Sequence, residues 1–206
     1  MKTKHFEKSL PEGYRQVFYL NAQSVKVGLI MNLIALVILA LVMVVAFLPL
    51  ILTGRFNGNT FIGDAQMITP MMIFCVAIFA YIVLHELVHG IAYKVLTGEK
   101  LTFGISWSCA FCGVPKIYVK RRISLIASAA PLVVFTVIFL ALAVWFYFVD
   151  PWSYVLTAVL FGLHLGGCSG DIYIILLLLF KFRDPETLIR DTGPEQTFYI
   201  PQNGDQ

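Results

Sequence analysis

Charged residues are scarce in this sequence. Its polar and apolar residues also do not alternate over short distances along most of the chain, as they do in soluble proteins. Of 206 residues, 13% are charged and 59% are hydrophobic, and the apolar residues come in long blocks. This composition excludes an ordinary soluble domain and places the chain in the membrane class. The sequence also lacks internal repeats, low-complexity segments and any sign of a second domain, so we expect one integral membrane domain over residues 1–206.

Cysteine is equally rare, and its placement does not suggest a disulfide framework. Cys75 and Cys168 fall inside apolar blocks, where a cysteine usually serves as a small buried hydrophobe. Cys109 and Cys112 form a lone C-x-x-C, which is at most half of a zinc ribbon. The cysteines therefore predict no stabilising disulfide bonds.

Four apolar blocks are long enough to cross a bilayer as helices. They cover about residues 27–52, 67–96, 123–149 and 152–180. The polar leader 1–26 has no small-residue cleavage site near its end, so we expect the first block to stay as an anchor. The predicted fold class is an all-α membrane protein with four transmembrane helices, a short β-hairpin between the second and third, and a tail over 181–206.

Lysine and arginine are distributed unevenly between these blocks. The leader carries five, the connection between the second and third blocks six, and the tail three, whereas the other two connections hold only Arg55. The positive-inside rule then places both termini and the middle connection in the cytoplasm of a multi-pass cell-membrane protein. The formal net charge of +3 reflects this topology and gives no case for nucleic acid.

The second block contains histidine, of which the chain has only 4, in the pattern H-E-x-x-H from His85 to His89. Residues at i and i+4 lie on one helix face, so both imidazoles can reach one metal ion, with Glu86 beside them. Catalytic zinc takes three protein ligands and leaves a position for water, whose proton a carboxylate accepts. The alternative is a chance match with hydrogen-bonded histidines, but charge at mid-span costs roughly 2.5–3.5 kcal/mol and usually marks function.

A third ligand can come from the fourth block, which offers His164 and Asp171 on nearly the same helix face. His85 precedes Lys94 by nine residues and Asp171 precedes Lys181 by ten, which are depths of roughly 14 and 15 Å. His164 precedes Lys181 by seventeen, or roughly 26 Å. Depth favours Asp171, with His164 as a second-sphere or transition-state group, or as a plain contact between helices. The glycine-rich run 166–170 can unwind the helix, and the depths calculated from a constant rise per residue would then no longer be accurate.

The third block places Ser124, Ser128 and Pro131 at i, i+4 and i+7. Proline lacks an N–H and displaces the carbonyl four residues earlier, so Pro131 frees backbone groups around Ala127 at the predicted depth of the metal. We expect Ser128 and Pro131 to help position a substrate. The alanines around them predict close helix packing.

These motifs resemble the site-two-protease type of intramembrane zinc metalloprotease and, more narrowly, a bacterial family of small membrane proteins described as "putative zincin peptidases". The matching segments are HELVHG at 85–90, AAPLV at 129–133 and SGD at 169–171. The resemblance implies zinc as cofactor, His85, His89 and Asp171 as its ligands, and Glu86 as general base. The usual asparagine after the proline run is absent, and so is a glycine after Asp171; His164 could fill one of these gaps.

The connection between the second and third blocks alternates strictly over LTFGISWSCAF, residues 101–111. A period of two predicts a strand, with a turn at 112–115 and a second strand at 116–120. Its edge, with Ser106 near the centre, is a candidate for holding an extended substrate. A plain interfacial loop anchored by Trp107 is the alternative.

The function that these features predict is a zinc endopeptidase acting on other membrane proteins near the cytoplasmic face. The rival is a zinc-binding scaffold, chaperone or transporter component without turnover. Glu86 favours the enzyme, because a structural site does not need that carboxylate and more often closes with a fourth ligand. The partners expected are a membrane-protein substrate and the lipid bilayer.

The predicted topology can be tested with reporter fusions. Because 14 of the 15 lysines and arginines fall on one predicted side, fusions at Lys120 and at the C-terminus should report cytoplasm. A fusion near Asn59 should report the outside. A cytoplasmic signal at Asn59 would contradict the depth comparison between Asp171 and His164.

Overall fold

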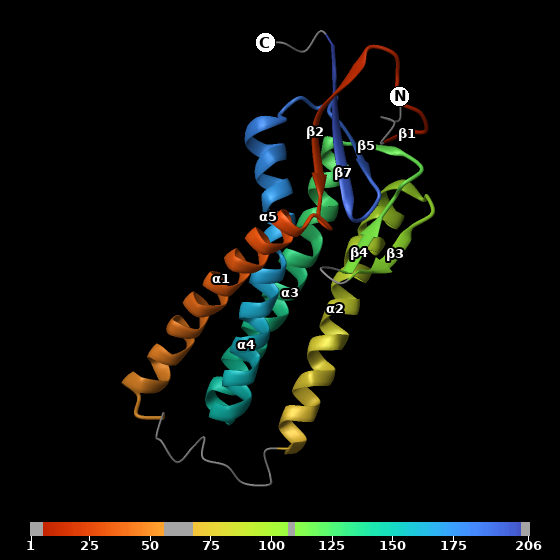
Figure 1. The fold of residues 1–206 in the computed structure, drawn as a ribbon. Helices are drawn as coiled ribbons and strands as arrows, with labels where there is room; N and C mark the ends of the chain where they lie inside the picture. Colours follow the sequence, from red (N-terminus) through yellow and green to blue (C-terminus); the bar gives the residue numbers. More distant parts are fainter. Residues whose placement is uncertain (1–5, 56–67, 107–109, 203–206) are drawn as a thin grey trace. The chain divides into compact units, whose positions relative to one another are not determined.

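The computed structural model describes residues 6–55, 68–106 and 110–202, and most of them are helical (Figure 1). The helices are α1 (Val25–Leu52), α2 (Ile68–Thr97), α3 (Arg121–Val149), α4 (Pro151–Gly167) and α5 (Ser169–Leu176), which continues into a π-helical turn (Leu177–Lys181). Three of these, α1 to α3, are long and apolar enough to cross a membrane. The most apolar window of α1 is only 6% buried and those of α2 and α3 are 11% buried, as expected for helices that face lipid. The fold is therefore compatible with a multi-pass membrane protein.

The predicted fourth span is a bent pair of helices rather than one continuous helix. Asp150 caps the start of α4 by accepting a hydrogen bond from the Ser153 N–H at 2.7 Å, and Pro151 fits the first turn. The break falls at Cys168, where the path bends by 41° within the glycine-rich run. The new helix places Asp171 in the first turn of α5.

A five-stranded sheet is the largest departure from the all-α prediction, which was wrong on this point. Its strands are β1 (Phe6–Glu7), β2 (Tyr14–Asn21), β5 (Tyr118–Lys120), β6 (Leu188–Asp191) and β7 (Glu195–Pro201). They are ordered β1-β5-β6-β7-β2, and every neighbouring pair is antiparallel. The segments expected as a polar leader and a tail therefore supply four of the five strands.

The predicted hairpin exists, but it is built differently. Strands β3 (Thr102–Ile105) and β4 (Ala110–Gly113) both come from the stretch predicted as one strand, and they pair with each other. The predicted second strand contains β5, which joins the five-stranded sheet instead. Gly104 allows this pairing to be close, because the ring of Phe111 on β4 occupies the space that a side chain at Gly104 would need. Trp107 and Cys109 lie outside the described residues.

The chain divides into two compact units, each built from several segments. The first contains residues 1–30, 84–131 and 170–206, and the second contains 31–83 and 132–169. In the second unit, α1 and α4 approach closely at glycines: a side chain on Gly166 would come within 2.9 Å of the Ala35 carbonyl oxygen. Tyr154 adds a hydrogen bond to the Ala46 carbonyl at 3.0 Å. Small residues at such contacts are typical of helices that pack in membranes.

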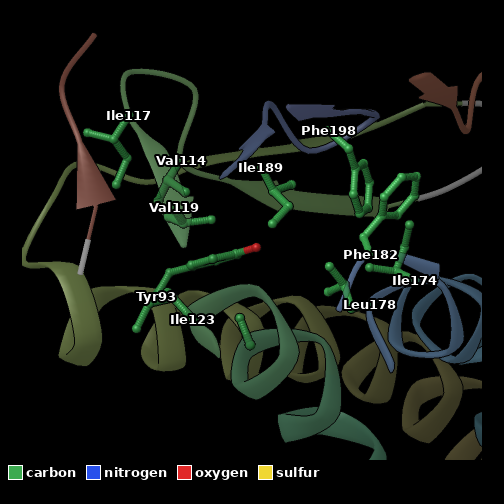
Figure 2. Close-up of a cluster of buried hydrophobic side chains, with 11 residues drawn as sticks. Tyr93, Val114, Ile117, Val119, Ile123, Ile174, Leu178, Phe182, Ile189 and Phe198 are labelled. Atoms are coloured by element: carbon green, nitrogen blue, oxygen red, sulfur yellow. The ribbon is translucent and has the colours of Figure 1, made fainter. Parts of the chain in front are cut away.

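The core of the first unit lies between strands and helices. Figure 2 shows side chains from β5, β6 and β7 directed at helical residues, with the Tyr93 ring between them. The fully buried members include Tyr93, Val119, Ile123, Leu178 and Ile189. This core joins the sheet to the last turns of α2, the first turns of α3 and the end of α5, and the candidate site lies on these same helices.

Candidate metal centre

His85 and His89 lie one turn apart on the same face of α2. Both side chains are buried, at 8% and 9% exposure, and their ring centroids are 4.9 Å apart. This is the arrangement that the i, i+4 spacing predicts for two imidazoles that share one ligand.

Asp171 from α5 meets both histidines. Its Oδ2 atom lies 3.4 Å from Nε2 of His85, and its Oδ1 atom lies 3.3 Å from Nε2 of His89. The three side chains belong to the same compact unit. Two imidazole nitrogens and one carboxylate therefore converge on one point.

The donor set and its spacing fit a metal ion such as zinc. The three ligand atoms lie within 4.8 Å of one another. Tetrahedral zinc, with bonds of about 2.0–2.2 Å, separates its ligand atoms by roughly 3.3–3.5 Å. The observed N···O distances of 3.3 and 3.4 Å match that edge and exceed an ordinary N–H···O hydrogen bond.

The orientation of His89 is fixed from its other ring nitrogen. Nδ1 of His89 lies 2.8 Å from the backbone carbonyl oxygen of Ala127 on α3. A carbonyl can only accept, so Nδ1 carries the proton, and in the neutral ring Nε2 keeps its lone pair toward Asp171. Metal-binding histidines usually donate their second ring N–H in this way.

Glu86 lies on α2 near the hairpin. The backbone of Cys112 on β4 is close enough to the Glu86 carboxylate to interact with it electrostatically. The hairpin can approach α2 this closely because Gly90 has no side chain: an added Cβ there would lie 2.6 Å from the ring of Phe103. Burial is the main cause that raises the pKa of the Cys112 thiol to about 12, so at neutral pH this side chain is a neutral thiol.

A buried carboxylate links the sheet to α2 one turn beyond the second histidine. Asp191, at 3% exposure, accepts hydrogen bonds from the hydroxyl of Tyr93 at 2.6 Å, the N–H of Gly193 at 2.8 Å and the amide of Gln196 at 3.2 Å. Its own carbonyl accepts from the N–H of Val114, directly after β4, at 2.9 Å. Burial is the main cause that raises the pKa of Asp191 to about 6. This contact was missed from the sequence, where only the Asp-Thr-Gly turn between two short alternating runs hints at it.

The other predicted residues lie as follows. His164 is fully buried in the second unit, where Nδ1 lies 2.9 Å from the Tyr81 hydroxyl and Nε2 lies 3.2 Å from the Thr136 hydroxyl. Ser128 is buried on α3, on the turn between Ala127 and Pro131. Ser106 directly follows the end of β3 and is not at the centre of a strand, so that part of the prediction was wrong.

Helices long enough to span a membrane, a His–His–Asp cluster that could hold a metal ion and an adjacent glutamate are compatible with one class of protein, that of multi-pass membrane proteins with a metal site. The chain belongs to the family described as "putative zincin peptidase", whose model matches residues 78–184, more than half of its length. The matched region contains all three candidate ligands and Glu86. No curated protein and no solved structure matches the chain.

The ligand set is tested by metal content. We expect purified protein to hold about one zinc per chain, and replacement of His85, His89 or Asp171 by alanine to deplete it, because three protein ligands hold a catalytic zinc. Glu86→Gln should retain zinc, and so should His164→Ala. The measurement is elemental analysis of each variant after equal dialysis against a weak chelator. Retention in Asp171→Ala together with loss in His164→Ala would contradict the proposed third ligand.

Proposed function

We propose that this protein is a zinc-dependent intramembrane endopeptidase that hydrolyses peptide bonds of membrane-protein substrates near the cytoplasmic face. The observation that carries the proposal is the convergence of Nε2 of His85 and Nε2 of His89 on the two oxygens of Asp171, at 3.4 and 3.3 Å. The family description adds zinc and peptidase chemistry. The length and apolar surface of α1 to α3 support a location in the membrane.

The chemistry is divided among the residues of the site. Zinc held by His85, His89 and Asp171 would supply the Lewis acidity that makes water a nucleophile near neutral pH. Glu86 follows the first ligand directly in the chain, and its carboxylate accepts the proton of the attacking water and returns it to the leaving amine. The Cys112 backbone lies near that carboxylate, and the Ala127 carbonyl orients His89.

The hairpin supports a way to hold the substrate. The described strands pair β3 with β4 alone, so the other edge of β3 is available for an added strand. Phe103 pairs with Cys112 and Ile105 with Ala110. In the alternating pattern of an antiparallel ladder, a Phe103–Cys112 pair without mutual hydrogen bonds leaves the Cys112 N–H on the side of Glu86, and Phe103 and Ile105 then direct their own N–H and C=O groups to the open edge. An extended substrate exposes its scissile amide, which a helical one hides in its own hydrogen bonds.

Catalysis is tested in cells that carry the parent protein, Glu86→Gln or a deletion. An endopeptidase should leave new protein termini, from cleaved membrane proteins, that are present with the parent and absent in both other strains. The measurement is mass spectrometry of protein termini in the membrane fraction. A Glu86→Gln strain with the same termini and phenotype as the parent, beside a deletion that differs, would favour the non-proteolytic scaffold.

Substrate holding is tested at Ile105, which is 74% exposed and whose N–H faces the open edge in this arrangement. Ile105→Pro removes that donor, and proline is tolerated on an outward-facing strand edge. We expect it to bind zinc like the parent and to lose most cleavage, roughly tenfold or more for a lost main-chain contact at about 1.4 kcal/mol per decade. Ile105→Ala keeps the N–H and is the matched control. Ser106→Pro, beyond the strand, should have the smaller effect. Equal cleavage by Ile105→Pro and Ile105→Ala would contradict strand addition.

A further inference from the structure

We propose that Pro131 is a positioning residue for the metal site. Its missing N–H leaves the Ala127 carbonyl free to accept the hydrogen bond from Nδ1 of His89, and this bond sets the nitrogen that His89 presents to the metal. The inference rests on the zinc site of the proposed function. It replaces the expectation that Pro131 positions the substrate.

The backbone of α3 provides the first step. In an α-helix the N–H of each residue bonds the carbonyl four residues earlier, so residue 131 is the regular helical donor for Ala127. α3 runs without interruption from Arg121 to Val149 with Pro131 inside it. Proline has no N–H, and its ring pushes that carbonyl aside. The Ala127 carbonyl therefore lacks its helical donor for a reason that lies in the sequence.

Burial makes the lost bond matter. Ala127 is fully buried, and a buried carbonyl without a donor is costly because water cannot replace it. Nδ1 of His89 supplies the donor at 2.8 Å. The bond therefore satisfies the orphaned carbonyl and fixes the imidazole at the same time.

The ring geometry connects this bond to the metal. With the proton on Nδ1, the neutral His89 ring has its lone pair on Nε2, and Nε2 is the atom that lies 3.3 Å from Oδ1 of Asp171. A competing N–H at position 131 would weaken the Nδ1 bond, release the ring and allow the other tautomer. Outer partners of metal-bound histidines typically contribute 10–100-fold in metal affinity.

A purely structural proline is the competing explanation, since proline also bends helices. The chain offers a matched control in Pro49, which lies inside α1 and in the other compact unit. Pro131→Ala and Pro49→Ala both restore a helical N–H, but only the first donor is aimed at the carbonyl that holds His89. A structural effect of removing proline predicts similar behaviour for both variants.

The experiment measures the zinc dissociation constant by competition with a chromophoric chelator, using full-length protein in detergent. We expect Pro131→Ala to weaken zinc binding by 10-fold or more and Pro49→Ala to leave it within twofold of the parent. A third protein carries lactic acid at position 131, introduced as an α-hydroxy acid, so that an ester oxygen replaces the N–H without a proline ring. It should bind zinc like the parent.

The outcomes separate the two proposals. Zinc binding by Pro131→Ala equal to the parent would overturn the positioning role alone, and so would weak binding by the lactic acid protein, because it also lacks the donor. If Pro131→Ala does not fold, the zinc affinity of the lactic acid protein still distinguishes the missing N–H donor from a structural role of the proline ring. Parent protein that binds zinc but leaves no cleaved termini in cells would overturn the proposed peptidase and leave the role of Pro131 standing. Parent protein that binds no zinc would overturn both.

Discussion

The shared carboxylate of Asp171 is the constraint on which the first unit depends. An aspartate inside an apolar helix is costly unless charged or polar groups compensate it, and a metal ion held between its two oxygens and the facing imidazole nitrogens would supply that compensation. To bring the three side chains together, α5 must start close to α2 with Asp171 in its first turn, and the break at Cys168 allows that start. The glycine-rich run therefore allows α5 to start in a new direction, because a continuous helix would direct Asp171 differently.

Glycines and small residues set how closely the surrounding backbone approaches the site. Gly90 accommodates the ring of Phe103, and Gly113 meets the backbone of Gly193 in the β6–β7 turn, where an added side chain would collide with main-chain atoms. Ala127 plays the same part on α3, where its carbonyl rather than its side chain makes the contact. The approach at Ala127 brings a backbone C=O to a side chain of the candidate site, and a backbone group is a rigid partner that needs no side-chain ordering.

The parts of the site that were predictable from sequence are those set by helix periodicity. The shared face of His85 and His89 and the orphaned carbonyl of Ala127 follow from helix periodicity and a bond to the fourth residue back. The depth of Asp171 in the membrane stays a prediction. The sheet was missed because β2 and β7 are short and mixed in polarity, and their pairing joins residues such as Tyr14 and Pro201 from opposite ends of the chain. The hairpin was misplaced because strict alternation over 101–111 says nothing about where a strand folds back, and the pairing of Gly104 with Phe111 depends on contacts between strands that alternation does not encode.

Asp191 shows why the sheet matters to a site made by helices. Its carboxylate accepts from Tyr93 on α2, and its carbonyl accepts from Val114 directly after β4. One residue of the β6–β7 hairpin therefore contacts both the helix that carries His85, Glu86 and His89 and the strand whose Cys112 backbone lies near Glu86. A helix alone can present two imidazoles and a glutamate, but it cannot fix the distance between that glutamate and a backbone group on another element. The sheet restrains this distance. A shift of β6 would have to break two hydrogen bonds together: the buried, charge-assisted bond from the Tyr93 hydroxyl to the Asp191 carboxylate, and the backbone bond from the Val114 N–H to the Asp191 carbonyl. Water cannot replace these bonds at the buried carboxylate.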